Sequence, residues 1–384
     1  MKKSLVLAAL LTFPLLASQT DPLSVTWQKA FGGSKDDVAK GVAATEDGGL
    51  IIASTTRSFG HGKTDMNVMK LDEKGNKLWQ KNFGGERKET ASAITQTADG
   101  GYIAVGSTKS YGAGGYDFYI VKMDANGEKI WEKVAGGAAK DDATAVTATK
   151  DGGVLVLGTT KSYGTGSYNY YAVKLDAKGE LEWEQVAGGK DWDIPSGVAE
   201  ADDGSFLLVG KSESFGENSY DGYVVKLSSQ GKFIWEKTFG GKKEDMISGI
   251  AKGKDGGFLM VGKTKSYKDK KGDAFIIKLD KDGKKVFVKT YGDKGKDRAF
   301  AVTATADGGY AITGSSRTMS YGRTDFILIM MNKDGEITGS NHYGAKKEEI
   351  AYGITELKDG GLVMVGDTKT HGSGGMDIYV VRVK

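Results

Sequence analysis

Short runs of apolar residues alternate with polar turn residues along most of the chain, and the runs have the length of β-strands. The stretch from Thr90 to Gly136 shows the pattern in four segments, which read TASAITQTAD, GYIAVGSTK, DFYIVKMD and KIWEKVAG. In these segments β-branched and aromatic residues alternate with polar ones or form continuous runs, bounded by glycine and aspartate. The apolar spacing of an amphipathic helix is missing. The pattern therefore predicts four antiparallel strands in this stretch.

The same pattern recurs every 52 residues. An Asp-Gly pair marks each copy, and such a pair is typical of a tight hairpin because glycine accepts a positive φ. The seven pairs begin at Asp47, Asp99, Asp151, Asp203, Asp255, Asp307 and Asp359. A repeated four-stranded unit is typical of a propeller blade. We expect an all-β fold, a seven-bladed β-propeller with four antiparallel strands per blade, that occupies residues 21–384 as a single domain.

Two features of the repeat favour a closed ring over an open stack. One position in the first strand of every unit is small, as crowding around a central axis requires. The residues at this position are Gly41, Ala93, Ala145, Gly197, Gly249, Ala301 and Gly353. In addition, the last repeat finishes after a third strand, DIYVVRVK, whereas VTWQKAFGG near the N-terminus has the pattern of a fourth strand. We expect this N-terminal strand to complete the last blade.

The units resemble those of a group of secreted bacterial and archaeal propellers with the pattern W-x-K-x-F-G-G, D-G-G, G-x-T-x-S-x-G and D-x-Y-x-x-K-L-D-x-x-G. By fold, that group is often placed with the quinoprotein-like propellers. The resemblance covers Asp21 to Lys384 and implies the propeller fold without implying a particular reaction. Five tryptophans recur at one strand position and are expected to be scaffold: Trp27, Trp79, Trp131, Trp183 and Trp235. Phe287 and Gly339 replace tryptophan in the two repeats that depart from the pattern.

Residues 1–20 are typical of a secretory signal peptide, because Lys2 and Lys3 precede the apolar run SLVLAALLTFPLLA. We therefore expect export to the periplasm, the cell surface or the medium, and no membrane span in the exported chain. The sequence has no cysteine, which excludes disulfides and thiolate metal sites. The formal charge of +3 falls to about +1 without the two leader lysines, so bulk charge does not favour nucleic acid as a partner.

Charged residues recur where the longer connections of the predicted ring meet, on the side that we name the long-loop face. An acid begins the first strand of every unit there, and we expect this charged ring to be structural, with each acid capping its turn or pairing with a base. The seven acids are Asp37, Glu89, Asp141, Asp193, Asp245, Asp297 and Glu349. His61 and His371 fall in equivalent loops of neighbouring blades, but we expect them to be solvated and predict no metal site.

Aromatic residues break the repeat on the third and fourth blades. The position of Trp192 is charged in the six other copies, so the scaffold does not require an aromatic side chain there. Together with aromatic residues of the neighbouring loops, it forms a candidate ligand-binding set of Trp192, Tyr163, Tyr168, Phe215 and Tyr220. In the alternative interpretation, the loop aromatics pack beneath their own loops, and Trp192 fills the space that Ala187 leaves in place of phenylalanine.

We find no arrangement of residues that indicates a catalytic site, and we predict no cofactor. The Gly-x-Gly stretches lack the following helix that a phosphate-binding loop requires. The sequence therefore favours a monomeric, non-catalytic binding or scaffold protein outside the cytoplasm, whose long-loop face binds a polypeptide or a glycan. The alternative is an enzyme of the quinoprotein-like oxidoreductase or glycan-hydrolase type, since 50 acidic residues leave open a pair of carboxylates at the spacing that a hydrolase uses.

Overall fold

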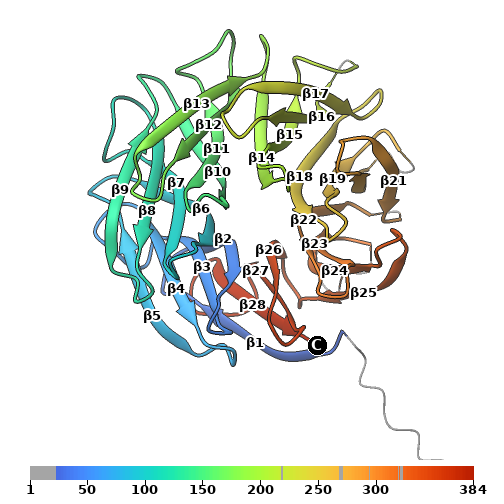
Figure 1. Cartoon of the computed structure of the whole chain (residues 1–384). Coiled ribbons are helices and arrows are strands. Elements are labelled where there is room, and N and C mark those ends of the chain that lie inside the picture. The colour runs from blue at the N-terminus through green and yellow to red at the C-terminus, as the bar shows by residue number, and fades with distance from the viewer. Residues whose placement is uncertain (1–22, 218, 268–270, 294, 319, 321–322) are drawn as a thin grey trace, which may run out of the picture.

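The computed structural model describes residues 23–384 except 218, 268–270, 294, 319 and 321–322, so the predicted leader at residues 1–20 lies outside the described part. Seven four-stranded antiparallel sheets stand as blades around a central axis (Figure 1). The predicted all-β, seven-bladed propeller is therefore confirmed. Within the described ranges, no helix is long and apolar enough to span a bilayer.

The first three blades follow one another along the chain. Blade 1 contains β2 (Asp37–Ala44), β3 (Leu50–Thr56), β4 (Asp65–Leu71) and β5 (Lys77–Phe83). Blade 2 contains β6 (Glu89–Gln96), β7 (Tyr102–Thr108), β8 (Asp117–Met123) and β9 (Lys129–Ala135). Blade 3 contains β10 (Asp141–Ala148), β11 (Val154–Thr160), β12 (Asn169–Leu175) and β13 (Leu181–Ala187).

The next three blades continue in the same order. Blade 4 contains β14 (Asp193–Glu200), β15 (Phe206–Ser212), β16 (Asp221–Leu227) and β17 (Phe233–Phe239). Blade 5 contains β18 (Asp245–Lys252), β19 (Phe258–Thr264), β20 (Asp273–Leu279) and β21 (Lys285–Tyr291). Blade 6 contains β22 (Asp297–Ala304), β23 (Tyr310–Ser316), β24 (Asp325–Met331) and β25 (Ile337–Tyr343).

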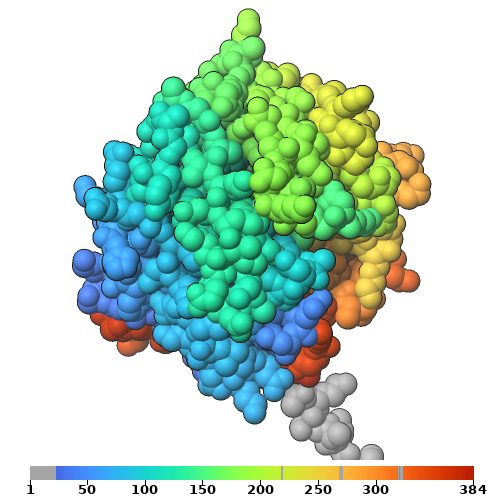
Figure 2. All heavy atoms as spheres, turned by 60° about the vertical axis from the view of Figure 1, so that its left-hand side comes forward, coloured from blue at the N-terminus to red at the C-terminus, as the bar shows by residue number. Residues whose placement is uncertain are grey.

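Blade 7 is made from both ends of the described chain. It contains β26 (Glu349–Glu356), β27 (Leu362–Thr368), β28 (Asp377–Val383) and, from the N-terminal side, β1 (Val25–Phe31). β1 pairs antiparallel with β28, and the blue β1 lies beside the red β28 in Figure 1. In Figure 2 red segments of the last blade again emerge next to blue segments. The prediction that the N-terminal strand completes the last blade is confirmed.

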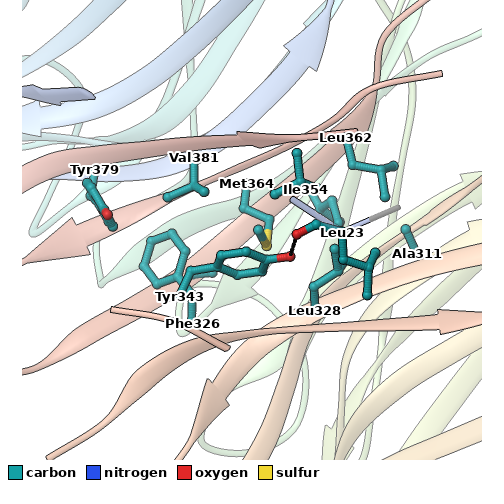
Figure 3. Close-up of a cluster of buried hydrophobic side chains, with 12 residues drawn as sticks. Leu23, Ala311, Phe326, Leu328, Tyr343, Ile354, Leu362, Met364, Tyr379 and Val381 are labelled. Carbon is teal, nitrogen blue, oxygen red and sulfur yellow. Dashed lines mark hydrogen bonds between the residues drawn. The ribbon is translucent and has the colours of Figure 1, made fainter. Parts of the chain in front are cut away.

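The hydrophobic core of the described residues is divided into seven layers, one between each pair of neighbouring blades. Figure 3 shows the layer between blades 6 and 7, where Phe326 and Leu328 pack against Met364. Leu23, just before β1, joins this layer, and its carbonyl accepts a hydrogen bond from the Tyr343 hydroxyl at 2.7 Å. Each blade therefore depends on its neighbours to bury its apolar faces.

The recurring tryptophans join each blade to the next. The indole of Trp183 in blade 3 donates a hydrogen bond to the Ser229 carbonyl of blade 4 at 3.0 Å. A Cβ added at Gly231 in the same turn would lie 2.6 Å from the indole, so the ring fits only over glycine. Blade 7 has β1 in place of such a turn. The preceding blade accordingly has Gly339 instead of tryptophan, and a Cβ there would contact Leu23 at 3.5 Å.

Close packing around the axis explains the small residues of the innermost strands. A Cβ added at Gly41 would lie 2.9 Å from the Cα of Ala93 in the next blade. A Cβ at Gly249 would lie 2.9 Å from the backbone oxygen of Phe300. Both distances are shorter than a normal van der Waals contact. The inner strands therefore approach one another too closely for larger side chains at these positions.

Deleting residues 24–33 removes β1 and should lower the melting temperature of the whole ring. It should also produce oligomers, because β28 becomes an unpaired edge. Val25→Ser is the control, since it changes an exposed side chain, leaves the backbone pairing intact and should keep the unfolding free energy within about 1 kcal/mol of the wild type. Thermal unfolding with light scattering measures both effects. A truncated protein that melts and scatters like the wild type would contradict closure by this strand.

Candidate functional site

The acid that begins each inner strand lies between the two long connections of its blade. In blade 3, Asp141 accepts hydrogen bonds from the backbone N–H of Gly137 at 2.9 Å and from the Ser162 hydroxyl at 2.6 Å. In the other blades the acid also accepts a bond from the backbone N–H four residues earlier, which belongs to Gly33, Gly85, Gly189, Gly241, Asp293 or Ala345. All seven acids are at most 1% exposed. The charged ring thus holds turns together and is not open to a ligand.

A second acid approaches this ring from the neighbouring blade. Asp117 and Asp141 meet at Gly136, where an added Cβ would collide with both carboxylates. Burial raises the pKa of Asp117, and the charge of Asp141 raises it further. In blade 3 the equivalent residue is Asn169, which places no charge next to Asp193. The charge of Asp117 is therefore unfavourable in the folded protein, and the repeat tolerates an amide in its place.

A further pair of positions lies on the same two connections of each blade. One is the residue directly before the recurring acid, and the other is the residue directly after the second strand. The backbone N–H of Arg57 donates to the carbonyl of Asp36 at 3.0 Å, and the equivalent residues are joined in every blade. The side chains form ion pairs in blades 1, 5 and 7, namely Arg57 with Asp36, Lys265 with Glu244, and Lys369 with Glu348. Blade 6 has two bases, Lys296 and Arg317, and the charge of Arg317 helps to lower the pKa of Glu348. Blades 1, 5 and 7 therefore neutralise the charge of this pair, whereas blade 6 does not.

Blades 2 and 3 carry two lysines at these paired positions. Lys88 faces Lys109 in blade 2, and Lys140 faces Lys161 in blade 3. Lys140 forms an ion pair with Asp142 at 2.6 Å. Among the described residues, no acid forms an ion pair with Lys88, Lys109 or Lys161. The long-loop face consequently has a local excess of positive charge over these two blades, although the net charge of the whole chain is close to neutral.

A tyrosine lies beside the lysines in three consecutive blades, directly before the third strand of each. One ammonium lies over each ring, with Nζ-to-centroid distances of 4.4 Å for Lys109 and Tyr116, 4.3 Å for Lys161 and Tyr168, and 3.7 Å for Lys211 and Tyr220. Lys140 reaches the first two rings, at 5.6 and 6.0 Å. Cations at these distances are attracted to the ring face. With Trp192, these residues make up the tyrosine–lysine arc: Lys109, Tyr116, Lys140, Lys161, Tyr168, Trp192, Lys211 and Tyr220.

Three of the five predicted aromatic residues belong to this arc. Trp192 packs edge-on against Tyr168, with ring centroids 5.2 Å apart, and remains 43% exposed. Tyr220 lies under Lys211 in the same blade. Burial raises the pKa of Tyr220 to about 12, together with its hydrogen bond to Glu213. Since Glu213 also offsets the positive charge in blade 4, the unpaired cations of the arc are concentrated in blades 2 and 3.

The other two predicted residues pack over their own blades. The ring of Tyr163 lies 5.2 Å from that of Tyr171, and its hydroxyl donates to the carbonyl of Gly136 at 2.8 Å. The ring of Phe215 stacks on Tyr223 at 5.1 Å. These contacts hold the long loops against the blades. Tyr163 and Phe215 therefore fit the packing interpretation better than the binding set.

Tyr170 fills the space beside Ala187. It stands opposite Ala187 in the pairing of β12 with β13 and is fully buried. Blade 2 has the same combination of a large and a small side chain, since Phe118 stands opposite Ala135. The large and small side chains compensate in volume across the two strands. Tyr170 therefore stands at the space beside Ala187, and the described ring contact of Trp192 is with Tyr168.

Tyr116 and the lysines of the arc were not in the predicted set. A signal was present, because tyrosine precedes the third strand only in repeats 2 to 4. The equivalent residues of the other repeats are Thr64, Gly272, Thr324 and Met376. In repeats 2 and 3 a lysine also occurs seven residues before the tyrosine. The combination is a cation–aromatic pair repeated on adjacent blades.

The structure describes the surroundings of two histidines, His371 and His342. His371 stacks on Tyr379 with ring centroids 5.2 Å apart. Burial lowers the pKa of His342, which favours its neutral form. Across the described residues, no group of three or more histidines and acids is arranged to hold a metal ion.

Comparisons with known proteins support the fold. No family model matches the chain. The chain is 24% identical to the regulatory protein FlaEY of Caulobacter vibrioides, over 78% of this chain but only 37% of FlaEY. Among solved structures, the WD40 domain of Neurospora crassa Pan2 has a TM-score of 0.54 at 13% identity and covers 92% of this chain and 97% of its own. A mutant of the NanB sialidase of Streptococcus pneumoniae has a TM-score of 0.52 at 11% identity, over 95% of this chain and 71% of its own.

Trp192→Ala should lower the unfolding free energy by at most about 1.5 kcal/mol, because the side chain is 43% exposed and makes one edge-on ring contact. Tyr170→Ala is the comparison, since it empties a buried site and should cost roughly 3 to 5 kcal/mol. Chemical denaturation of both variants measures the difference. A loss of about 3 kcal/mol or more for Trp192→Ala would show that Trp192 is part of the packed scaffold.

Asp117→Asn should stabilise the protein at pH 7. The folded-state pKa of Asp117 is raised, so its ionised form opposes folding above that pKa, and this opposition fades as pH falls towards the unfolded value. The gain in denaturation midpoint should therefore shrink between pH 7 and pH 4. Asn169→Asp is the reverse variant and should lose stability at pH 7. Equal midpoints at pH 7, or a gain that grows on acidification, would contradict this account of the junction.

Proposed function

We propose that this chain is a monomeric, non-catalytic binding or scaffold protein that works outside the cytoplasm and uses its long-loop face to bind an acidic polypeptide. The observation that carries the proposal is the replacement of ion pairs by lysine pairs in blades 2 and 3. Unpaired lysines at neighbouring positions repel one another and are stabilised when an anionic partner arrives. The leader-like sequence at residues 1–20 supports export.

The shape of the arc favours a polypeptide over a neutral glycan. A sugar ring stacks on the open face of an aromatic side chain, but a lysine ammonium already lies over each of the three tyrosine rings. Carboxylates of a peptide can reach those ammonium groups while Trp192 supplies an exposed apolar contact. One tyrosine and at least one lysine per blade match an extended chain that crosses several blades.

The comparison proteins agree with partner binding without identifying a partner. The distant relative FlaEY is a regulatory protein, and its shared part is a minority of its length. Placement in the quinoprotein-like group rests on the sequence pattern, and it carries no reaction over to this chain. We therefore base the proposal on the charges and rings of blades 2 to 4.

Binding of a fluorescent oligoglutamate peptide tests the proposal. We expect the wild type to bind it with an affinity that falls as salt rises, and Lys109→Gln/Lys161→Gln to bind about tenfold more weakly. Lys74→Gln/Lys178→Gln is the matched control, because both lysines are exposed in tight turns of the opposite face, and it should bind like the wild type.

Three results would overturn the proposal. These are the absence of peptide binding by the wild type, a loss of affinity in the control as large as in the arc variant, and binding of polygalacturonate at the arc without binding of the peptide. The last result would reassign the long-loop face to an anionic glycan. A fold check by circular dichroism on each variant separates lost binding from lost structure.

A further inference from the structure

Every inner strand has a β-bulge at the same place. In β2 the pairing register shifts between Ala39 and Gly41, so Lys40 lies outside the ladder. A bulge re-aims the side chain of its extra residue. The seven residues at this position are Lys40, Ser92, Thr144, Ser196, Ser248, Phe300 and Tyr352. All seven line one cavity, which therefore lies on the axis of the ring.

The size and position of this cavity suit a small molecule. Its volume is about 450 Å³, within the range of roughly 300–1,000 Å³ that is usual for small-molecule sites. Blades 2 to 5 contribute serine or threonine at the bulge, whereas blades 1, 6 and 7 contribute a lysine and two aromatic residues. The cavity therefore has a hydroxyl wall and a cationic, aromatic wall. The two walls differ although the strands and turns of the seven blades repeat.

The hydroxyl wall presents hydrogen-bond acceptors. The Ser196 hydroxyl donates to the carbonyl of Ile247 at 2.8 Å, and the Thr144 hydroxyl donates to the carbonyl of Leu157 at 3.2 Å. Since these protons are used within the protein, the two oxygens keep their lone pairs for another donor. Such a wall suits a ligand that offers several O–H groups.

The opposite wall presents a half-buried cation that forms no ion pair within the described residues. The ammonium of Lys40 lies 3.0 Å from the centroid of Tyr352, whose ring packs against Phe300 at 5.4 Å. Among the described residues, no carboxylate forms an ion pair with Lys40. Burial lowers the pKa of Lys40 to about 8, although the charge of Asp367 acts in the opposite direction. An anion placed here would stabilise the charged lysine, and the adjacent ring of Phe300 offers an apolar contact.

Asp367 adds a buried acceptor beside Lys40. It is 7% exposed, and within the described residues its Oδ1 accepts no hydrogen bond. Burial raises the pKa of Asp367 to about 6, with Glu348 raising it further and the charges of Lys40 and Lys369 lowering it. In blade 1 the equivalent residue is Thr55, whose hydroxyl accepts from the backbone N–H of the next blade at 2.9 Å. The aspartate is thus a local departure from the repeat, and its Oδ1 has no hydrogen-bond donor among the described residues.

We propose that this axial cavity binds a small polyhydroxy carboxylate of the uronic-acid class. The ligand carboxylate binds at Lys40, its hydroxyl groups donate to Thr144 and Ser196, and the apolar face of its ring lies against Phe300. Asp367 does not line the cavity and acts on the site through its charge beside Lys40. This site is separate from the tyrosine–lysine arc, so either proposal can fail without the other.

Calorimetric titration with glucuronate tests the site. We expect the wild type to bind glucuronate at least tenfold more tightly than glucose, which lacks the charge, and than acetate, which lacks the hydroxyl groups. Lys40→Met should weaken glucuronate binding at least tenfold, whereas Lys178→Met, in an exposed turn, should leave it unchanged. Failure to bind glucuronate, equal binding of glucose, or unchanged binding by Lys40→Met would each overturn the proposal.

A second measurement needs no variant and remains decisive if Lys40→Met does not fold. At pH 8 about half of the Lys40 side chains are neutral, and Asp367 is mostly ionised. Within the described residues, the ionisable side chains that face Lys40 are those of Asp367 and Tyr352, and the pKa of Tyr352 lies too high for it to titrate at this pH. A bound carboxylate should raise the pKa of Lys40, so binding should take up as much as about half a proton per ligand. Calorimetry in two buffers of different ionisation enthalpy measures the uptake, and binding without proton uptake would place the ligand elsewhere.

Discussion

Antiparallel pairing between β1 and β28 joins the two ends of the described chain and makes the seven sheets one closed ring. Because the apolar core lies in layers between blades, each blade needs a neighbour on both sides. The first and last blades have neighbours on both sides only when the ring closes. The exchange of tryptophan for Gly339, where Leu23 packs, adapts the repeat to this junction. Closure also brings blade 7 next to blade 1, and with it Tyr352 and Asp367 next to Lys40.

The fold could be predicted from the sequence because the repeat is regular and every blade has the same turns. The candidate site could be predicted only in part. Trp192 and Tyr220 could be selected from the sequence because they are aromatic residues where the repeat is broken. Whether Tyr163 packs on its own blade depends on the direction of its loop, which the repeat pattern does not determine. The cross-strand pair of Tyr170 and Ala187 depends on the register in which β12 pairs with β13. A one-residue error in that register would have placed Tyr170 on the opposite face.

Residues that recur in all seven blades and residues that break the repeat have different roles. The buried acids and the tryptophans recur because every blade needs its turns tied and its neighbour covered. The lysine pairs, the three tyrosines and the Lys40 wall of the cavity occur in only a few blades, so the scaffold does not need them. We propose that function resides at these departures, on the long-loop face over blades 2 to 4 and in the axial cavity.

Hydrogen exchange with and without bound oligoglutamate tests this assignment most directly, because it maps the whole surface at once. The account predicts slower exchange in the loops that carry Lys109, Tyr116, Lys161 and Tyr168, and unchanged exchange in the tight turns of the opposite face. Protection spread equally over the long loops of all seven blades, or confined to the tight turns, would contradict the claim that partner binding resides where the repeat is broken.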